Sequence, residues 1–176
     1  RKSDGRYLAA GTDSWLQTFR RDQKLQRECE RFYFQQNDFS PEKSLRKLQL
    51  VLDALGISSD YGSQHQLALM PEPSTLAFAG FDRYQRPLWM QDDAAIAWKR
   101  MQSRAAHDSI TLEAISGYRG HAYQYGIFKR KLARGQSVQE ILKVNAAPGY
   151  SEHHTGRAID IGTPNEPPAE ESFEST

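Results

Sequence analysis

Cysteine is almost absent from this chain of 176 residues: Cys29 stands alone, so no disulfide can form within the sequence. A single thiol is compatible with the cytoplasm, the periplasm and the cell surface, and it does not distinguish between them. Long apolar runs are also missing. No run approaches the roughly 18 residues that a membrane-spanning helix requires, and no signal-peptide pattern is found. We therefore expect no membrane span in this chain.

An excess of charge of either sign is missing as well. The sequence has 23 lysines and arginines against 22 aspartates and glutamates, and its formal net charge is +1. No overall field would attract a nucleic acid or an anionic membrane, so we expect neither as a partner. With 38% hydrophobic residues, the chain is long enough to bury one core, with room for a helical appendage.

The first third of the sequence is predicted to be helical. An apolar stripe among many charged residues indicates a helix over residues 13–34. A second helix is expected to begin at Ser40, with Pro41 in its first turn, and to end at Gly56. Its leucines favour packing onto the domain, although the same stripe is also typical of a docking face. We assign residues 1–65 to an N-terminal helical region, and a stretch rich in Gly, Ser, Gln and Pro separates it from the rest.

Short strands and helices follow, and we assign them to a second domain over residues 75–176. The predicted elements are, in order, a strand over 76–81, a helix capped by Asp92 or Asp93, a central strand over 111–115, a helix over 121–132 and a short helix that begins with the capping box of Ser137 and Glu140. Strands and helices do not alternate regularly. This pattern favours an α+β fold, in which helices pack on a small antiparallel sheet.

The segment 151–161 carries the most specific pattern of the sequence. It places His153 and Asp160 seven residues apart around Gly156. Isoleucines on both sides of Asp160 alternate with it as in a strand, so the carboxylate is expected to point away from the core. If the chain is extended before Gly156 and turns back there, the imidazole and the carboxylate converge. Zinc accepts both ligand types.

A catalytic zinc site needs three protein ligands and one position for water. Only two good ligands are found in the sequence. His154 is adjacent to His153, and on an extended chain its side chain would face the opposite way, toward solvent or substrate. The prediction is therefore a pair of ligands, His153 and Asp160, without a third.

Several motifs occur in a fixed order around this segment. They are Ser116-Gly117-Tyr118-Arg119, Gln124, Phe128, Ala147-Pro148-Gly149-Tyr150, and the run from Ser151 to Asp160, which fits Ser-x-His-x-x-Gly-x-Ala-x-Asp at every fixed position. Together they resemble the D-alanyl-D-alanine carboxypeptidase (VanY-like) family of zinc peptidases. The resemblance covers roughly residues 75–176, and it implies that Zn²⁺ is bound by His153 and Asp160.

The resemblance also implies an activity and a substrate. Members of this family hydrolyse a peptide bond and release a terminal D-amino acid, D-alanine, from peptidoglycan stem peptides, which implies a location in the periplasm or cell envelope. Arg119 would contact the substrate near the scissile bond, while Gln124 and Ser151 would line the substrate cleft. Related enzymes cut either a D,D or an L,D bond, and both specificities stay open here.

The sequence departs from the family pattern in two places. Gly120 follows Arg119 where the family usually has Ser. The family motif Glu-x-x-His-x-Trp, which supplies the general base and the third zinc ligand, does not occur before Thr176. We therefore expect the chain as given to be cut short and inactive, unless a partner chain completes the domain. Two other interpretations are a noncatalytic cell-wall-binding or scaffolding protein with the same fold, and an inactive fragment whose helical region binds a partner.

Overall fold

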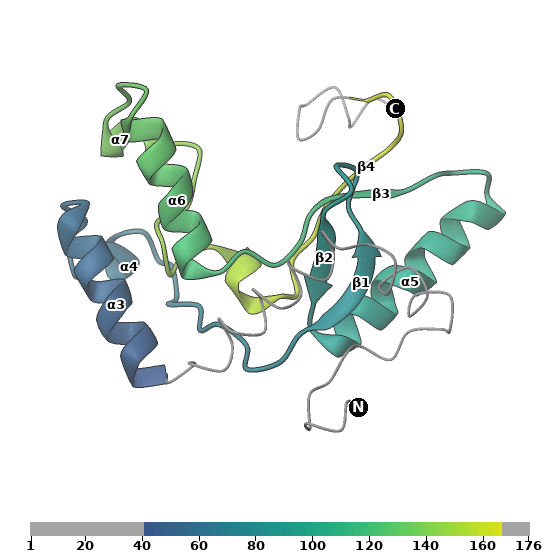
Figure 1. Ribbon diagram of the computed structural model, residues 1–176, viewed down its shortest axis with the longest axis horizontal. Coiled ribbons are helices and arrows are strands. Elements are labelled where there is room, and N and C mark those ends of the chain that lie inside the picture. Colours follow the sequence, from purple (N-terminus) through teal and green to yellow (C-terminus); the bar gives the residue numbers. More distant parts are fainter. Residues whose placement is uncertain (1–40, 167–176) are drawn as a thin grey trace. The chain divides into compact units, whose positions relative to one another are not determined.

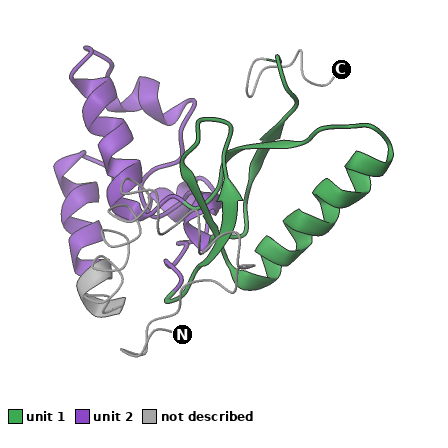
Figure 2. Ribbon diagram, turned by 45° about the vertical axis from the view of Figure 1, so that its right-hand side comes forward, with its two compact units in different colours: residues 1–38, 74–118, 156–176 green, residues 39–73, 119–155 purple. Residues whose placement is uncertain are grey.

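The structure is a computed structural model that describes residues 41–166. The helix predicted over residues 13–34 lies outside them. The described chain divides into two compact units, coloured separately in Figure 2. Within the described residues, unit 1 consists of 74–118 and 156–166, and unit 2 consists of 41–73 and 119–155.

Unit 2 is helical. Its elements are α3 (Pro41–Ala54), α4 (Tyr61–Gln64), α6 (His121–Leu132), α7 (Val138–Leu142) and the 3-10 helix η1 (Glu152–Thr155). One core joins its two chain segments, and its buried members are Leu48, Leu52, Leu55, Ile57, Tyr61, Phe128, Ile141 and Ala147. Figure 1 shows α3 beside α6. Leu48 and Leu52 of α3 are therefore packing residues, each contributing about 1.5–3 kcal/mol, whereas Leu45 and Leu50 of the same helix are exposed.

Local signals explain where these helices begin and end. Pro41 occupies the first helical position of α3, where its missing N–H is not needed. Gly56 has φ +66° just after that helix, a conformation that glycine adopts readily. The capping box that starts α7 is present: the Ser137 hydroxyl accepts the Glu140 N–H, and the Glu140 carboxylate accepts the Ser137 N–H at 2.7 Å. The predictions of these helices and of α6 are confirmed.

Unit 1 contains the strands. Its elements are β1 (Ala77–Phe81), β2 (Pro87–Met90), α5 (Asp92–His107), β3 (Glu113–Ser116) and β4 (Asp160–Gly162). They form two antiparallel pairs, β1 with β2 and β3 with β4. A buried cluster joins these elements, and its members are Ala79, Leu88, Met90, Ala95, Trp98 and Ala114. Figure 1 shows α5 alongside β1 and β2. Small antiparallel sheets with packed helices confirm the α+β prediction.

Three details of unit 1 differ from the sequence predictions. Strand β2 was not predicted, because it has only four residues and begins with a proline. The strand predicted over 111–115 is not central: within the described residues β3 pairs only with β4. The N-cap of α5 is Gln91, which makes no side-chain cap bond, and Asp92 and Asp93 lie in the first turn instead. Carboxylates there stabilise the helix through its dipole.

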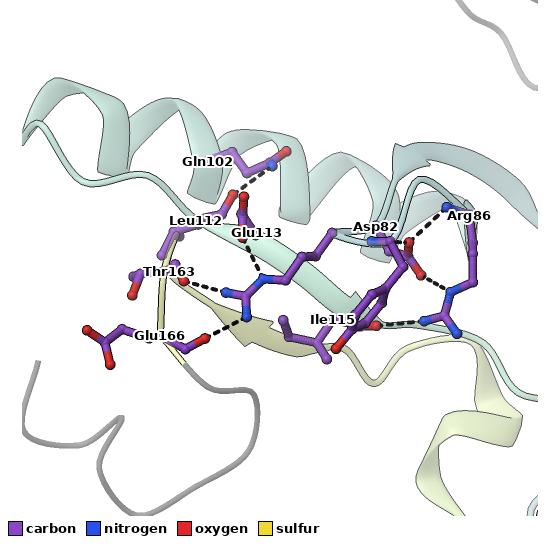
Figure 3. A network of polar contacts seen from close by, with 10 residues as sticks. Asp82, Arg86, Gln102, Leu112, Glu113, Ile115, Thr163 and Glu166 are labelled. Atoms are coloured by element: carbon purple, nitrogen blue, oxygen red, sulfur yellow. Dashed lines mark hydrogen bonds and ion pairs between the residues drawn. The ribbon is translucent and has the colours of Figure 1, made fainter.

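Two arginines hold the ends of these strands, as Figure 3 shows. The Asp82 carboxylate accepts the N–H of Arg86 at 2.9 Å and its Nε at 2.6 Å, which closes the turn from β1 to β2. Arg83 bonds to Glu113 at 2.6 Å and to the carbonyl oxygens of Thr163 and Glu166. Because those two carbonyls follow β4, Arg83 fixes the chain directly after this strand.

The division of the chain into regions 1–65 and 75–176 stays a prediction. Between residues 41 and 166, no helix has both the length and the apolar character that a membrane span requires.

Candidate active site

The five site residues predicted from the sequence divide between the two units. Arg119, Gln124, Ser151 and His153 belong to unit 2, while Asp160 belongs to unit 1.

The segment that carries the histidines is not extended, contrary to the prediction. Residues Glu152–Thr155 form the 3-10 helix η1, and the chain turns afterwards at Gly156, which has φ +70°. A Cβ at Gly156 would lie 2.7 Å from the Leu76 side chain, so only glycine fits. A 3-10 turn has three residues, which directs the neighbouring side chains of His153 and His154 to different sides. His153 is buried, with an exposed fraction of 3%.

The prediction that His154 faces solvent or substrate is wrong. Its side chain is fully buried, with an exposed fraction of 0%. Its Nε2 accepts the N–H of Gly149 at 3.0 Å, and its Nδ1 lies 2.5 Å from the carbonyl oxygen of Arg119. Because Nε2 is an acceptor, Nδ1 must carry the proton and donate it. Sequence patterns did not reveal this role, since Arg119 is 35 residues away.

Burial lowers the pKa of His154 from 6.5 to about 4. The hydrogen bond to the Arg119 carbonyl raises it, and the charges of His121 and Arg119 lower it again. His154 is therefore neutral at pH 7, which agrees with one ring nitrogen donating and the other accepting.

The backbone of Arg119 is held at both of its polar groups by η1. Its N–H donates to the carbonyl oxygen of His153 at 3.1 Å, and its carbonyl accepts from the ring of His154. Arg119 itself is half-buried. Consecutive residues of η1 thus determine where the Arg119 side chain begins.

Packing explains why the Ser-Gly-Tyr-Arg motif contains a glycine. A Cβ at Gly117 would lie 2.5 Å from a methyl carbon of Leu88 and 3.1 Å from the carbonyl oxygen of Trp89. That same carbonyl accepts the N–H of Tyr118 at 3.0 Å. The motif therefore passes β2 at a distance that only a residue without a side chain allows.

Gln124 is buried in α6, with an exposed fraction of 2%. Its amide nitrogen donates to the carbonyl oxygen of Ala146 at 2.8 Å, whereas its Oε1 has no hydrogen-bond partner among the described residues. An unsatisfied buried acceptor costs about 1–3 kcal/mol. Gln124 thus keeps one acceptor that a ligand N–H could satisfy. Ser151 is also buried, and its carbonyl oxygen accepts the N–H of His154.

His121, which was not predicted as a functional residue, supports this arrangement. Its ring meets the ring of His154 edge to face, with centroids 4.5 Å apart. Its Nε2 lies 2.9 Å from the carbonyl oxygen of Met70, and its backbone N–H donates to the Glu72 carboxylate at 2.8 Å. Only its position two residues after Arg119 could have suggested a role.

In unit 1, Asp160 is the first residue of β4, opposite Ser116 in the ladder with β3. Ile159 and Ile161 pack against the unit 1 core, as the alternation predicted. Asp160 itself is half-buried. Among residues 41–166, no three His, Cys, Asp or Glu side chains gather as a possible metal site. The chemistry of His153 and Asp160 still fits zinc, which binds imidazole nitrogen and carboxylate oxygen.

Comparison with known proteins identifies the family. Residues 87–176, more than half of the chain, match the family model VanY, D-alanyl-D-alanine carboxypeptidase. The chain belongs to this family, and all five predicted site residues lie within the matched range.

Individual relatives agree. The chain is 28% identical over 136 residues to "Putative carboxypeptidase YodJ" of Bacillus subtilis (strain 168), a match that covers 75% of this chain and 50% of that protein. The chain thus spans about half the length of this curated relative.

Solved structures are similar as well. The LdcB LD-carboxypeptidase, whose structure is described as revealing the molecular basis of peptidoglycan recognition, has a TM-score of 0.54 and 29% identity, covering 62% of this chain and 57% of that one. A mutant of the vancomycin resistance D,D-pentapeptidase VanY in complex with Zn(II) has a TM-score of 0.42 and 23% identity, covering 56% of this chain and 61% of that one.

Proposed function

We propose that this protein is a zinc-dependent carboxypeptidase that removes a terminal D-amino acid, D-alanine, from peptidoglycan stem peptides in the periplasm or cell envelope. Membership of the VanY family and the likeness to LdcB support this proposal. The observation that carries it is the hydrogen bond from the Arg119 N–H to the His153 carbonyl, which joins the two family motifs in one piece of structure.

His153 and Asp160 would hold the zinc ion. The buried imidazole of His153 and the half-buried carboxylate of Asp160 are donors that zinc accepts. The chemistry that zinc supplies when bound is Lewis-acid polarisation of a carbonyl and a water that ionises near neutral pH.

Arg119 would bind the negative charge of the substrate. Its planar fork of donors suits either the terminal carboxylate of the stem peptide or the negative charge that develops on the scissile carbonyl. Gln124 would accept a substrate N–H with its unsatisfied Oε1, and Ser151 would line the same cleft. These residues would orient the peptide, and positioning of this kind can remove about 7–11 kcal/mol of a reaction barrier.

The test uses full-length protein, with zinc added, incubated with a pentapeptide stem that ends in D-Ala-D-Ala and with a tetrapeptide stem that ends in D-Ala. Mass spectrometry should show loss of one alanine from at least one of them. Release from the pentapeptide alone means D,D specificity, and release from the tetrapeptide alone means L,D specificity. A chelator should abolish release, and added zinc should restore it.

Zinc-loaded protein that releases nothing from either peptide would contradict the proposal. Sedimentation of the protein with purified peptidoglycan would then favour the noncatalytic cell-wall-binding interpretation. A His153→Ala variant is the matched control, since it should keep the helical signal and lose release.

A further inference from the structure

His154 uses both ring nitrogens on backbone groups of other segments, although it carries none of the proposed chemistry itself. One nitrogen binds the Gly149 N–H and the other binds the Arg119 carbonyl. An apolar side chain would fill the same buried space without needing two partners in defined places. We infer that His154 is a positioning residue for Arg119, an inference that rests on the proposed role of Arg119 in binding substrate.

The backbone at Arg119 needs such support because it has no regular structure. Residues 117–120 belong to neither a strand nor a helix, since β3 ends at Ser116 and α6 begins at His121. No ladder or helical hydrogen bond therefore fixes the peptide of Arg119. The two bonds to η1 replace them. A displacement of about 1 Å in a positioned catalytic group can lower a rate by about a hundredfold.

The other partner of His154 cannot move easily. Gly149 has φ +90°, and a Cβ there would lie 2.7 Å from the side chain of Leu48 and 3.0 Å from that of Leu69. Its carbonyl oxygen also accepts the N–H of Met70 at 2.7 Å. The imidazole therefore connects Arg119 to a turn that the core of unit 2 holds in place.

His121 adds further contacts to this network. It packs its ring on His154 and binds the carbonyl of Met70, the residue that also binds Gly149. Three chain segments surround His154, at residues 119–121, at Gly149 and at Met70. Met70 is hydrogen-bonded to both of the others. Rotation of the imidazole would break bonds to two segments at once, so the ring fixes Arg119 in one place.

A double-mutant cycle tests whether His154 acts through Arg119. In zinc-loaded full-length protein, His154→Leu keeps the volume and loses both hydrogen bonds, and kcat/KM for the stem peptide should fall about thirtyfold. In an Arg119→Ala background, the same change should lower kcat/KM by less than about threefold, because the group that it positions is already gone. Equal losses in both backgrounds would overturn the inference and make His154 a core residue only.

Two further variants make the cycle selective. His154→Gln keeps a donor and an acceptor on one planar group, so it should recover most of kcat/KM; a folded His154→Gln protein as slow as His154→Leu would refute the inference. His107→Leu removes an exposed histidine at the end of α5 and should leave kcat/KM unchanged. Zinc content is measured in every variant, because His154 is adjacent to His153.

A readout without turnover separates this inference from the proposed function. In ¹⁵N NMR spectra, the amide of Arg119 should shift in His154→Leu and stay near its original position in His154→Gln. Protein that cleaves neither stem peptide but shows these shifts would reject the proposed function and keep the positioning of Arg119. An unchanged Arg119 amide in a folded His154→Leu protein would reject the positioning itself.

Discussion

The two units hold the chain near their predicted site residues with different chemical groups. In unit 2, a neutral and fully buried imidazole, His154, binds backbone groups around Arg119. In unit 1, the charged Arg83, whose side chain is 17% exposed, binds Glu113 and two carbonyls after β4. A buried charge is expensive unless it is fully paired, whereas a neutral ring loses less on burial. The depth of each anchor explains the difference, and four experiments test this explanation.

The largest effect is expected at Arg119, whose backbone belongs to the anchor of unit 2. Arg119→Ala should lower kcat/KM at least about a hundredfold, as loss of an oxyanion donor does, while the melting temperature stays nearly unchanged. The backbone bonds to η1 do not involve the side chain, so they should persist. Steady-state kinetics and a thermal scan check both parts, and retained activity would contradict the role of Arg119.

The second effect is a loss of stability at acidic pH, and it is caused by His154 in unit 2. The folded-state pKa of His154, about 4, lies below its value of 6.5 without burial. Between these values the unfolded chain binds a proton that the folded protein does not. Stability should therefore be complete above about pH 6.5 and decrease by up to about 3 kcal/mol as the pH falls to about 4.

Urea unfolding of the metal-free protein at several pH values measures this decrease. His154→Gln is the matched control, because it removes the titrating ring and keeps the carboxylates, whose contributions cancel between the two proteins. Parallel curves for wild type and variant between pH 4 and 6.5 would show that His154 does not cause the decrease.

A comparable effect should follow from changing the turn that anchors His154. Gly149→Ala combines an unfavourable backbone conformation with a contact of 2.7 Å to Leu48, and it should cost about 2–4 kcal/mol. Gly56→Ala is the control: its φ is +66°, but no atom lies within 4 Å of the added Cβ, so about 1–2 kcal/mol is expected. Equal unfolding midpoints for both variants would contradict the role of packing.

The smallest effect is expected in unit 1. Arg83→Lys loses the fork that reaches Glu113 and two carbonyls, and it should cost about 1–2 kcal/mol. Faster amide exchange in the β3–β4 ladder, at Ala114 and Ile161, would locate the loss. Arg104→Lys changes an exposed pair with Asp108 at 3.5 Å and should cost less than about 0.5 kcal/mol. Exchange that quickens equally in both variants would remove Arg83 as an anchor.

The sequence predicted the elements whose signals are local. Pro41 at the start of α3, the capping box of Ser137 and the apolar alternation around Asp160 each act within a few residues, and each prediction was correct. Family motifs also led to the VanY family, which the comparisons confirm. The roles of the individual site residues stay predictions.

One error concerns an interaction between distant segments, and another concerns a strand too short to produce a pattern. His154 was expected to face solvent or substrate, because an alternating pattern cannot show that Gly149 and Arg119 offer it a donor and an acceptor. These contacts do not change the periodicity of the sequence, so pattern alone could not find them. Strand β2 was missed for a local reason, since it has only four residues and begins with a proline.

The 3-10 turn at Glu152–Thr155 has a consequence for protein engineering. The carbonyl of His153 and the ring of His154 both form hydrogen bonds with the backbone of Arg119. Their spacing therefore tolerates neither an inserted nor a deleted residue. Libraries that seek a new substrate preference should leave this loop at its native length and sequence. Diversity is better introduced at exposed positions of α6, such as Tyr123, where replacements leave the hydrogen bonds to Arg119 intact.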